Sequence, residues 1–167
     1  MIRKLTKADV RKYKQLRLLA LTTDPDAYFA TYAEEERRDE WSIATEIAAH
    51  AFPFGYFGWF DTDQHLRAYI QIAPAYFAKT NHTADVYNLY VHPEFRRQGI
   101  AKELLLQVLS HLRERKSVEI LYLSVMQSNS AALHMYERLG FTTVGIKKAA
   151  VKLGSQYENE VLLQLEL

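Results

Sequence analysis

The spacing of apolar residues in the first 50 positions predicts a short strand followed by two helices. Residues 2–5, in which Ile2 and Leu5 flank two basic residues, are expected to form a short strand. Thr6 and Asp9 have the spacing of a capping box, and apolar residues then recur at every third position, so a helix is expected to end near Asp24. The apolar positions of that helix are Val10, Tyr13, Leu16 and Leu19. A second helix is expected over residues 34–50.

In the middle of the chain, the spacing of apolar residues first predicts strands and then changes to the period of a helix. Residues 55–60 and 66–73 are aromatic and β-branched runs separated by a polar turn at 61–64, which is typical of an antiparallel hairpin. Residues 85–91 predict a further strand, which Pro93 ends because proline has no N–H to donate. A helical stripe follows at Ala101, Leu104, Leu105, Val108, Leu109 and Leu112.

The last third of the chain completes a parallel crossover. Residues 120–125 are almost continuously apolar, as expected of a strand buried on both faces, and a strand, helix, strand order implies a parallel pair. A shorter helix is predicted over 129–139, with Gly140 as its left-handed C-terminal residue. Residues 141–148 and 160–167 predict two closing strands. The expected order is βααβββαβαββ, a mixed α/β fold with a mostly antiparallel central sheet and about four helices.

Length and composition limit the classes of function. A chain of 167 residues favours one domain over 1–167. Lys plus Arg is 21 and Asp plus Glu is 20, a net charge of +1 that disfavours a dedicated nucleic-acid or membrane binder. The absence of cysteine excludes disulfides, Cys-ligated metals and thiol nucleophiles. No stretch approaches a membrane span, so a cytoplasmic location is expected, and the six histidines form no metal-binding motif.

Residues 96–101 stand at the N-terminus of the helix with the leucine stripe. The first N–H groups of a helix lack helical partners and the positive end of its dipole lies there, so an anion such as a pyrophosphate can bind. Gly99 allows close approach to the backbone, and Arg96 and Arg97 add positive charge. Taken alone, these six residues favour a helix start with a tolerated glycine and two solvated arginines. The parallel crossover around them favours the anion site.

The motif and its flanks resemble the GCN5-related N-acetyltransferase (GNAT) superfamily. The family motif is Arg or Gln, two residues, Gly, one residue, and Gly or Ala, and it is matched by Arg96, Gly99 and Ala101. Residues 89–94 before the motif and 129–141 after it are also similar to family sequence. The resemblance is specific over residues 83–141 and loose elsewhere.

The resemblance implies an enzyme that uses acetyl-CoA as co-substrate, requires no metal, and transfers the acetyl group to a primary amine by direct attack in a ternary complex. It implies that the two parallel strands splay around the pantetheine arm and that the N–H of Leu89 faces the acetyl oxygen as an oxyanion-hole donor. The implied cofactor-binding residues are Leu89, Tyr90, Val91, Arg96, Arg97, Gln98, Gly99, Ile100, Ala101, Lys102, Asn129 and Tyr136.

Three residues are candidates for the chemistry itself: Tyr136, Asp85 and Leu89. Asn129 and Tyr136 are seven residues apart and so share one helix face, and the family uses this pair to bind pantetheine and protonate the departing thiolate. Tyr136 could instead be a packed aromatic residue. Asp85 is the candidate general base, and its even spacing from Leu89 predicts that both side chains lie on one strand face. A solvated carboxylate at a strand start is the alternative.

The amine acceptor stays open between a small molecule and a protein, and a homodimer is possible. The aromatic residues between Phe52 and Phe60 could line an acceptor pocket, although core packing is the more common role of such a run. The resemblance implies that the late turn expected at Tyr157 and Asn159 helps to shape the acceptor site, although relatives frequently have aspartate where this chain has Asn159. A non-catalytic acyl-CoA-binding or regulatory protein of the same fold is the main alternative. An RNA-binding module is disfavoured because no basic stripe accompanies the aromatic residues.

Overall fold

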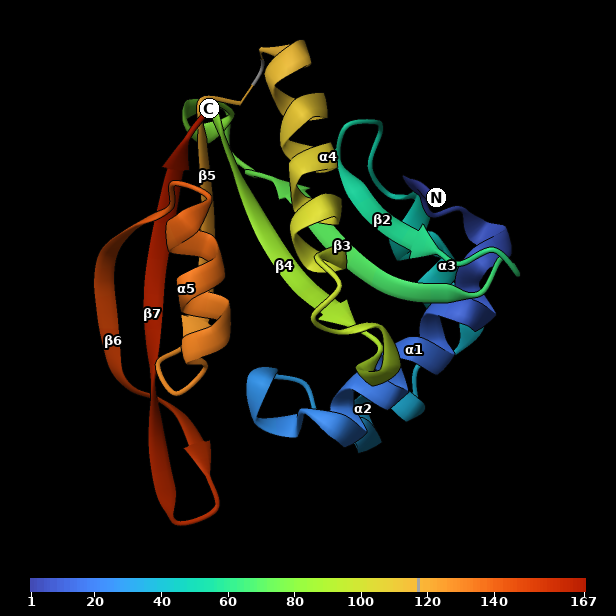
Figure 1. Ribbon diagram of the computed structural model, residues 1–167, viewed down its shortest axis with the longest axis horizontal. Helices are drawn as coiled ribbons and strands as arrows, with labels where there is room; N and C mark the ends of the chain where they lie inside the picture. Colours follow the sequence, from blue (N-terminus) through green and yellow to red (C-terminus); the bar gives the residue numbers. More distant parts are fainter. Residues whose placement is uncertain (117) are drawn as a thin grey trace.

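The computed structural model describes residues 1–116 and 118–167, and its strands form one seven-stranded sheet in the order β1-β2-β3-β4-β5-β7-β6 (Figure 1). Every neighbouring pair is antiparallel except β4 and β5, which run parallel as predicted. The strands are β1 Ile2–Lys4, β2 Gly55–Phe60, β3 Leu66–Pro74, β4 Thr83–Val91, β5 Ile120–Met126, β6 Thr142–Leu153 and β7 Gln156–Glu166.

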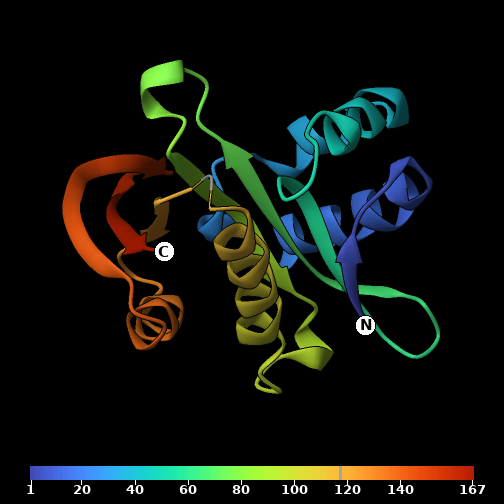
Figure 2. The same cartoon turned by 90° about the horizontal axis from the view of Figure 1, so that it is seen from above.

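Helices cover both faces of the sheet (Figure 2). The α-helices are α1 Val10–Thr23, α2 Tyr32–Glu36, α3 Glu40–Ala48, α4 Ile100–Arg115 and α5 Ser130–Arg138. Short 3-10 turns are η1 Lys7–Asp9, η2 Pro25–Ala27, η3 Ala78–Thr80 and η4 Pro93–Phe95. In the part of the chain so described, no helix is both long enough and apolar enough to cross a membrane.

Two apolar clusters, one on each face, hold the helices to the sheet. The leucine stripe of α4 packs with Val86, Leu123 and Tyr136 on one face, which we call the α4 face. Residues of α1 and α3 pack with Tyr56, Phe60, Tyr69 and Tyr90 on the other, which we call the α1 face. Aromatic residues of β2 are therefore part of the core, with Tyr56, Phe57 and Phe60 at most 1% exposed. This settles the role of those three residues in favour of packing.

The parallel pair separates along its length. Its register runs from Thr83 opposite Ile120 to Val86 opposite Leu123 and then ends, although β4 continues to Val91 and β5 to Met126. The predicted splay of the two strands is confirmed. Since β5 stays paired with β7 along its whole length, the separation opens the sheet only between β4 and β5.

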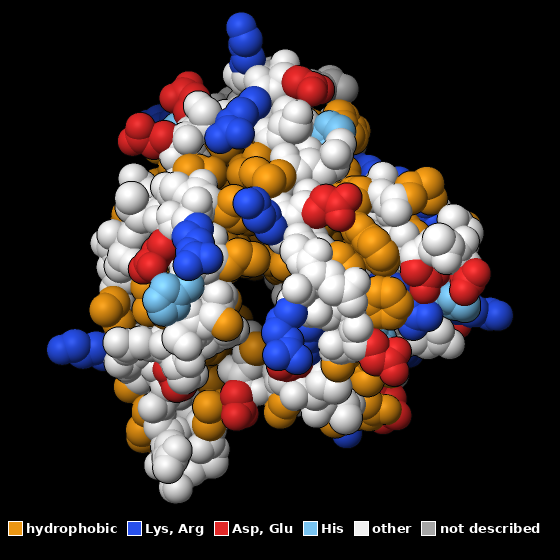
Figure 3. All heavy atoms as spheres, in the orientation of Figure 1, with side chains coloured by type: hydrophobic (Ala, Val, Ile, Leu, Met, Phe, Trp, Pro, Cys, Tyr) orange, Lys and Arg blue, Asp and Glu red, His pale blue; other side chains and the backbone are white. Residues whose placement is uncertain are grey.

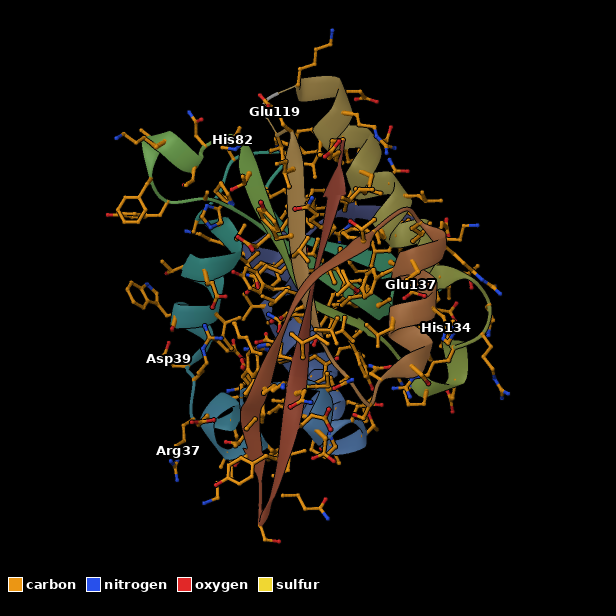
Figure 4. All side chains as sticks on the ribbon, turned by 90° about the vertical axis from the view of Figure 1, so that its left-hand side faces the viewer. Arg37, Asp39, His82, Glu119, His134 and Glu137 are labelled. Atoms are coloured by element: carbon orange, nitrogen blue, oxygen red, sulfur yellow. The ribbon has the colours of Figure 1, made fainter. Side chains whose placement is uncertain are left out.

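The single helix predicted over 34–50 is wrong, because two helices occupy this segment. Thr31 caps α2 by accepting from the N–H of Glu34, and Asp39 caps α3 by accepting from the N–H of Ser42 at 2.7 Å. A side chain that caps a new helix competes with continuation of the previous one, so the chain breaks between the two. Figure 4 shows Arg37 and Asp39 at this break, at the edge of the molecule.

The closing strands are longer than predicted. They meet at a tight turn at Gly154, whose φ of +62° is a left-handed conformation suited to glycine. Tyr157 and Asn159 therefore lie in β7 and not in a turn, which corrects the expectation for both. Gly140 follows α5 with a φ of +94°, as predicted for its C-terminal residue.

Candidate functional site

The separated ends of β4 and β5 open a cleft of about 380 Å³. Figure 3 shows the surface hollowed at this place, between α5 and the start of α4. The cleft is lined by Asp24, Tyr28 and Phe29 near η2, by β4 from Val86 to Val91, by β5 from Leu123 to Met126, and by Arg96, Ala101, Asn129, Met135 and Tyr136. Seven of the twelve cofactor-binding residues implied by the resemblance line this cleft: Leu89, Tyr90, Val91, Arg96, Ala101, Asn129 and Tyr136. Arg97, Gln98 and Gly99 are in the loop that follows Arg96, and Ile100 and Lys102 are in the first turn of α4.

A bulge in β4 shapes the cleft wall. Tyr90 pairs with Tyr69 and Tyr87 pairs with Gln71, so β4 contains one more residue than β3 between these pairs. Asn88 has a left-handed φ of +55°, and its side-chain nitrogen donates to the Gln71 side-chain oxygen at 2.8 Å. This hydrogen bond stabilises the unusual backbone of the bulge. The strand edge at Asn88 and Leu89 is therefore turned away from ordinary pairing with β3.

The bulge overturns the prediction that Asp85 and Leu89 share a strand face. Val86 packs on the α4 face and Tyr90 on the α1 face, although they are four residues apart, so the alternation shifts between them. Leu89 packs on the α4 face with Val86. Asp85, next to Val86 in the chain, therefore projects to the opposite face. It is half-buried, which raises the pKa of its carboxyl, and it lies beside the cleft rather than in its lining.

Tyr28 contributes a contact that the sequence did not reveal. Its hydroxyl donates to the carbonyl oxygen of Leu89 at 3.3 Å, and its ring lies over the Arg17 guanidinium at 4.7 Å from the ring centre. Arg17 is itself buried and pairs with Glu35 at 3.6 Å. Tyr28 thus connects the segment after α1 to the cleft wall. The only sequence signal was an aromatic residue shortly after Asp24-Pro25, which has no functional specificity.

The loop before α4 leaves a row of backbone N–H groups without protein partners. Arg97 and Gly99 have left-handed φ values of +60° and +82°, and Gly99 is the N-cap of α4. The first N–H bonded to the new helix is that of Glu103, which donates to the Gly99 carbonyl at 2.9 Å. Within the described chain, no acceptor meets the N–H groups of residues 97–102. This arrangement is suited to a phosphate.

The Arg96 side chain points along the cleft wall instead of into the loop. Its guanidinium donates to both carboxylate oxygens of Asp24, at 3.3 and 2.5 Å, and to the Val91 carbonyl at 3.0 Å. It also lies 5.5 Å from the centre of the Tyr90 ring. The hydrogen bond to Asp24 is the largest of several effects that raise the pKa of Arg96, so its charge is fixed. Arg96 is a brace between the loop and the end of α1.

Asn129 and Tyr136 line the cleft from one face of α5, as their spacing predicts. The Asn129 side-chain oxygen caps α5 by accepting from the N–H of Ala132 at 3.1 Å, which leaves its side-chain NH₂ available. Tyr136 is 6% exposed and packs edge-on against Phe141 at 5.4 Å between ring centres. In Figure 4, His134 and Glu137 project from the outer side of the same helix.

The Tyr136 hydroxyl lies in a buried environment that favours its neutral form. Burial raises its pKa, so the phenol stays protonated at neutral pH and above. Among the described residues, none forms a hydrogen bond with this hydroxyl, and Tyr136 lines the cleft. Its packing against Phe141 fixes the ring, so Tyr136 is both a core residue and a cleft residue. Elsewhere, the described His, Asp and Glu side chains form no group of three suited to a metal ion.

Comparison with known proteins identifies the family. The model of the acetyltransferase (GNAT) family matches residues 16–141. The ribosomal protein bS18-alanine N-acetyltransferase of Salmonella typhimurium is 30% identical over 134 residues, covering 76% of this chain and 88% of the relative. The mycothiol acetyltransferase of Salinispora arenicola is 31% identical over 134 residues, but the chain spans 44% of that protein.

A solved structure has the same fold. The structure of yncA from Salmonella typhimurium, solved with its cofactor acetyl-CoA, superposes with a TM-score of 0.84 at 18% identity, covering 99% of this chain and 92% of the other. At that identity the likeness concerns the fold. The sequence matches carry the assignment: the chain belongs to the acetyltransferase (GNAT) family and is an N-acetyltransferase.

Proposed function

We propose that the protein transfers the acetyl group of acetyl-CoA to a primary amine by direct attack within a ternary complex. One observation carries the proposal: the N–H groups of residues 97–102 have no acceptor among the residues that the structure describes, and they stand at the N-terminus of α4, where the cleft between β4 and β5 opens. These N–H groups fit a diphosphate. The open edges of the two strands fit an extended amide-containing chain such as pantetheine.

Each cleft residue has a role in this proposal. The N–H groups of residues 97–102 and the side chain of Lys102 hold the diphosphate, while the backbones of Leu89, Tyr90 and Val91 and the side chain of Asn129 hold the pantetheine arm. When bound, acetyl-CoA supplies the thioester carbon that the amine nitrogen attacks. The N–H of Leu89 stabilises the charge that develops on the acetyl oxygen, an effect worth about 3 to 4 kcal/mol in other enzymes.

Proton transfer is assigned to two side chains. The Tyr136 hydroxyl protonates the sulfur as the carbon–sulfur bond breaks, which fits its place in the cleft and its raised pKa. Asp85 accepts a proton from the amine through water, because it lies beside the cleft and outside its lining. Burial raises the pKa of Asp85, which makes its carboxylate a stronger base than an exposed aspartate.

The acceptor class proposed first is the amino group of an N-terminal alanine in a protein. The match to the Salmonella relative covers 88% of that relative's length, and the relative is named for that reaction on ribosomal protein bS18. A ribosomal-protein acceptor also fits the proposed cytoplasmic location. A small amine related to mycothiol is the second class, because the mycothiol acetyltransferase matches at 31% identity.

The test combines binding and turnover. Calorimetry with acetyl-CoA measures the cofactor site, and thiol release measures transfer to a panel of amines. The panel holds peptides that begin with alanine, the same peptides with a blocked N-terminus, a peptide with an internal lysine, and an amino sugar. We expect thiol release only with a free N-terminal alanine. Failure of the protein to bind acetyl-CoA, or to release thiol with any amine, would overturn the proposal.

A further inference from the structure

Glu160 is a buried carboxyl that the proposed chemistry does not use. Among the described residues, the buried acidic side chains are Asp9, Glu35 and Glu160. Asp9 pairs with Arg3 beside η1, and Glu35 pairs with Arg17 and Arg38 and so holds α2 to α1. These two have structural roles near the N-terminus. Glu160, on β7, is 4% exposed and lies next to the strand that forms one wall of the cleft.

The sheet register places Glu160 on the same face as Ser124. In the β5–β7 pair, Ser124 lies opposite Leu162 and Met126 lies opposite Glu160. The intervening residues, Leu123 and Val125 on β5 and Val161 and Leu163 on β7, are buried on the α4 face. Side chains alternate along a strand, so Ser124 and Glu160 both project to the other face. Figure 4 shows β7 running past β5 in this region.

Ser124 connects this face to the cleft. It lines the cavity near the point where β4 and β5 separate, and it is exposed there. Asp85 lies on the same face of the sheet, opposite Tyr122 of β5. The face opposite α4 therefore brings a hydroxyl, a half-buried carboxyl and a buried carboxyl to the edge of the opening. Ser124 is exposed in the cleft, so an amine that enters the cleft can reach its hydroxyl.

The charge state of Glu160 sets the direction of hydrogen bonding. The Lys147 ammonium, on β6, lies 3.0 Å from a Glu160 carboxylate oxygen, and Lys147 is itself largely exposed. Burial raises the pKa of Glu160, but the neighbouring Ser124 hydroxyl and Lys147 ammonium lower it by more, so the net pKa is below the ordinary value. Glu160 is ionised at neutral pH and can only accept hydrogen bonds. Ser124 is the diagonal neighbour of Glu160 across the β5–β7 pair, so in a hydrogen bond between the two the Ser124 hydroxyl is the donor.

We propose that Glu160 is a positioning residue, which fixes the Ser124 hydroxyl as the hydrogen-bond acceptor for the incoming amine. A hydroxyl has one proton and two lone pairs, so donation to Glu160 leaves the lone pairs available to accept a hydrogen bond. An N–H of the acceptor then bonds to the Ser124 oxygen. This orients the amine near the thioester. The inference rests on the proposed N-acetyltransferase function and concerns its acceptor side alone.

The experiment is a double-mutant cycle on acceptor KM. The variants are Ser124→Ala, Glu160→Gln and the double change, assayed with an alanine-terminated peptide and with the best amine of the panel. We expect each single variant to raise the acceptor KM by about tenfold, as for one lost hydrogen bond, with the KM for acetyl-CoA unchanged. The double variant should lose no more than either single variant, because Glu160 acts through Ser124. Ser124→Thr, which keeps the hydroxyl, should restore most of the affinity.

Asp9→Asn is the matched control, because it removes another buried carboxylate from an ion pair away from the cleft. It should lower the melting temperature and leave the acceptor KM unchanged. If Glu160→Gln fails to fold, Ser124→Ala against Ser124→Thr still tests the hydroxyl. This inference would be overturned if the two single variants had additive effects on the acceptor KM, or if Ser124→Ala left the acceptor KM unchanged. Acetyl transfer by the wild-type protein would still support the proposed function in that case. A wild-type protein that transfers no acetyl group would overturn both.

Discussion

The Arg96 guanidinium donates to both carboxylate oxygens of Asp24, at 3.3 and 2.5 Å. The first residue of the family motif is therefore joined to the C-terminal end of α1, 72 positions earlier in the chain. Both residues line the cleft, so the pair closes one part of its wall. The remaining donation by Arg96, to the Val91 carbonyl, fixes the end of β4 at the same point.

Asp24→Asn should strengthen the binding of acetyl-CoA at low salt. The change removes a negative charge from a cleft that receives a multiply charged anion, while the amide can still accept from Arg96. At this exposure we expect a gain of about threefold in affinity, shrinking as ionic strength rises. Calorimetry at two salt concentrations measures it. A loss of affinity would show that the ion pair is needed to hold the loop in shape.

Gly99→Glu should abolish acetyl-CoA binding. The substitution places a negative side chain at the start of α4, where the free N–H groups are expected to bind phosphate, and Gly99 has a φ of +82°. The matched control is Gly154→Glu in the β6–β7 turn. Gly154 also has a left-handed φ, +62°, and open space around it. The Gly154→Glu control introduces a similar backbone strain and the same charge, and its affinity for acetyl-CoA should be unchanged. Equal losses of affinity in the two variants would contradict a phosphate site at Gly99.

Tyr136→Phe should slow acetyl transfer by on the order of 10²-fold, the range for losing one general acid. The ring packing against Phe141 is kept, so calorimetry should still show acetyl-CoA binding. The control is Tyr76→Phe, because Tyr76 is 92% exposed and distant in sequence from the cleft residues of α5. Unchanged single-turnover rates in the Tyr136 variant would remove the hydroxyl from the mechanism.

The Arg3–Asp9 ion pair should make stability depend on acid pH. Hydrogen bonding from Arg3, opposed by burial, lowers the pKa of Asp9 to about 2. A lowered folded-state pKa stabilises the protein above the ordinary pKa of about 4, and this contribution is lost as pH falls through about 2. We expect about 2 kcal/mol at neutral pH. Denaturant unfolding of Asp9→Asn should show that deficit at pH 7 and little at pH 2, whereas the exposed Asp63→Asn should show none.

Regular periodicity predicted the elements that build the cleft. The leucine stripe gave α4, and the continuous apolar run at 120–125 gave the buried strand β5. Both patterns reflect side chains that are buried in the folded protein, so they can be recognised in the sequence alone. The helix over 34–50 failed because capping at Asp39 is a local hydrogen bond that no apolar period reveals. Tyr28 and Arg17 were missed for a related reason, since their contacts join segments distant in sequence.

The geometry of β4 was the main feature hidden from the sequence. An even spacing places two side chains on one face only in a strand without a bulge. Asn88 adopts a left-handed backbone and bonds to Gln71 on another strand, and neither fact can be obtained from the spacing of Asp85 and Leu89. The sequence nevertheless identified residues that line one cleft in the structure, among them Leu89, Asn129 and Tyr136. It did not predict the strand face on which Asp85 lies.

Asp85→Asn tests the base assigned on that strand. A general base must be ionised, and burial raises the pKa of Asp85 above its ordinary value of about 4. As the pH is lowered, the wild-type rate should therefore begin to fall while the pH is still above about 4. The asparagine cannot accept the proton, so the acid limb should flatten and kcat should drop by on the order of 10²-fold. Asp63→Asn, in the exposed β2–β3 turn, should keep both the rate and the limb. An unchanged profile for Asp85→Asn would assign proton removal to water or to another group.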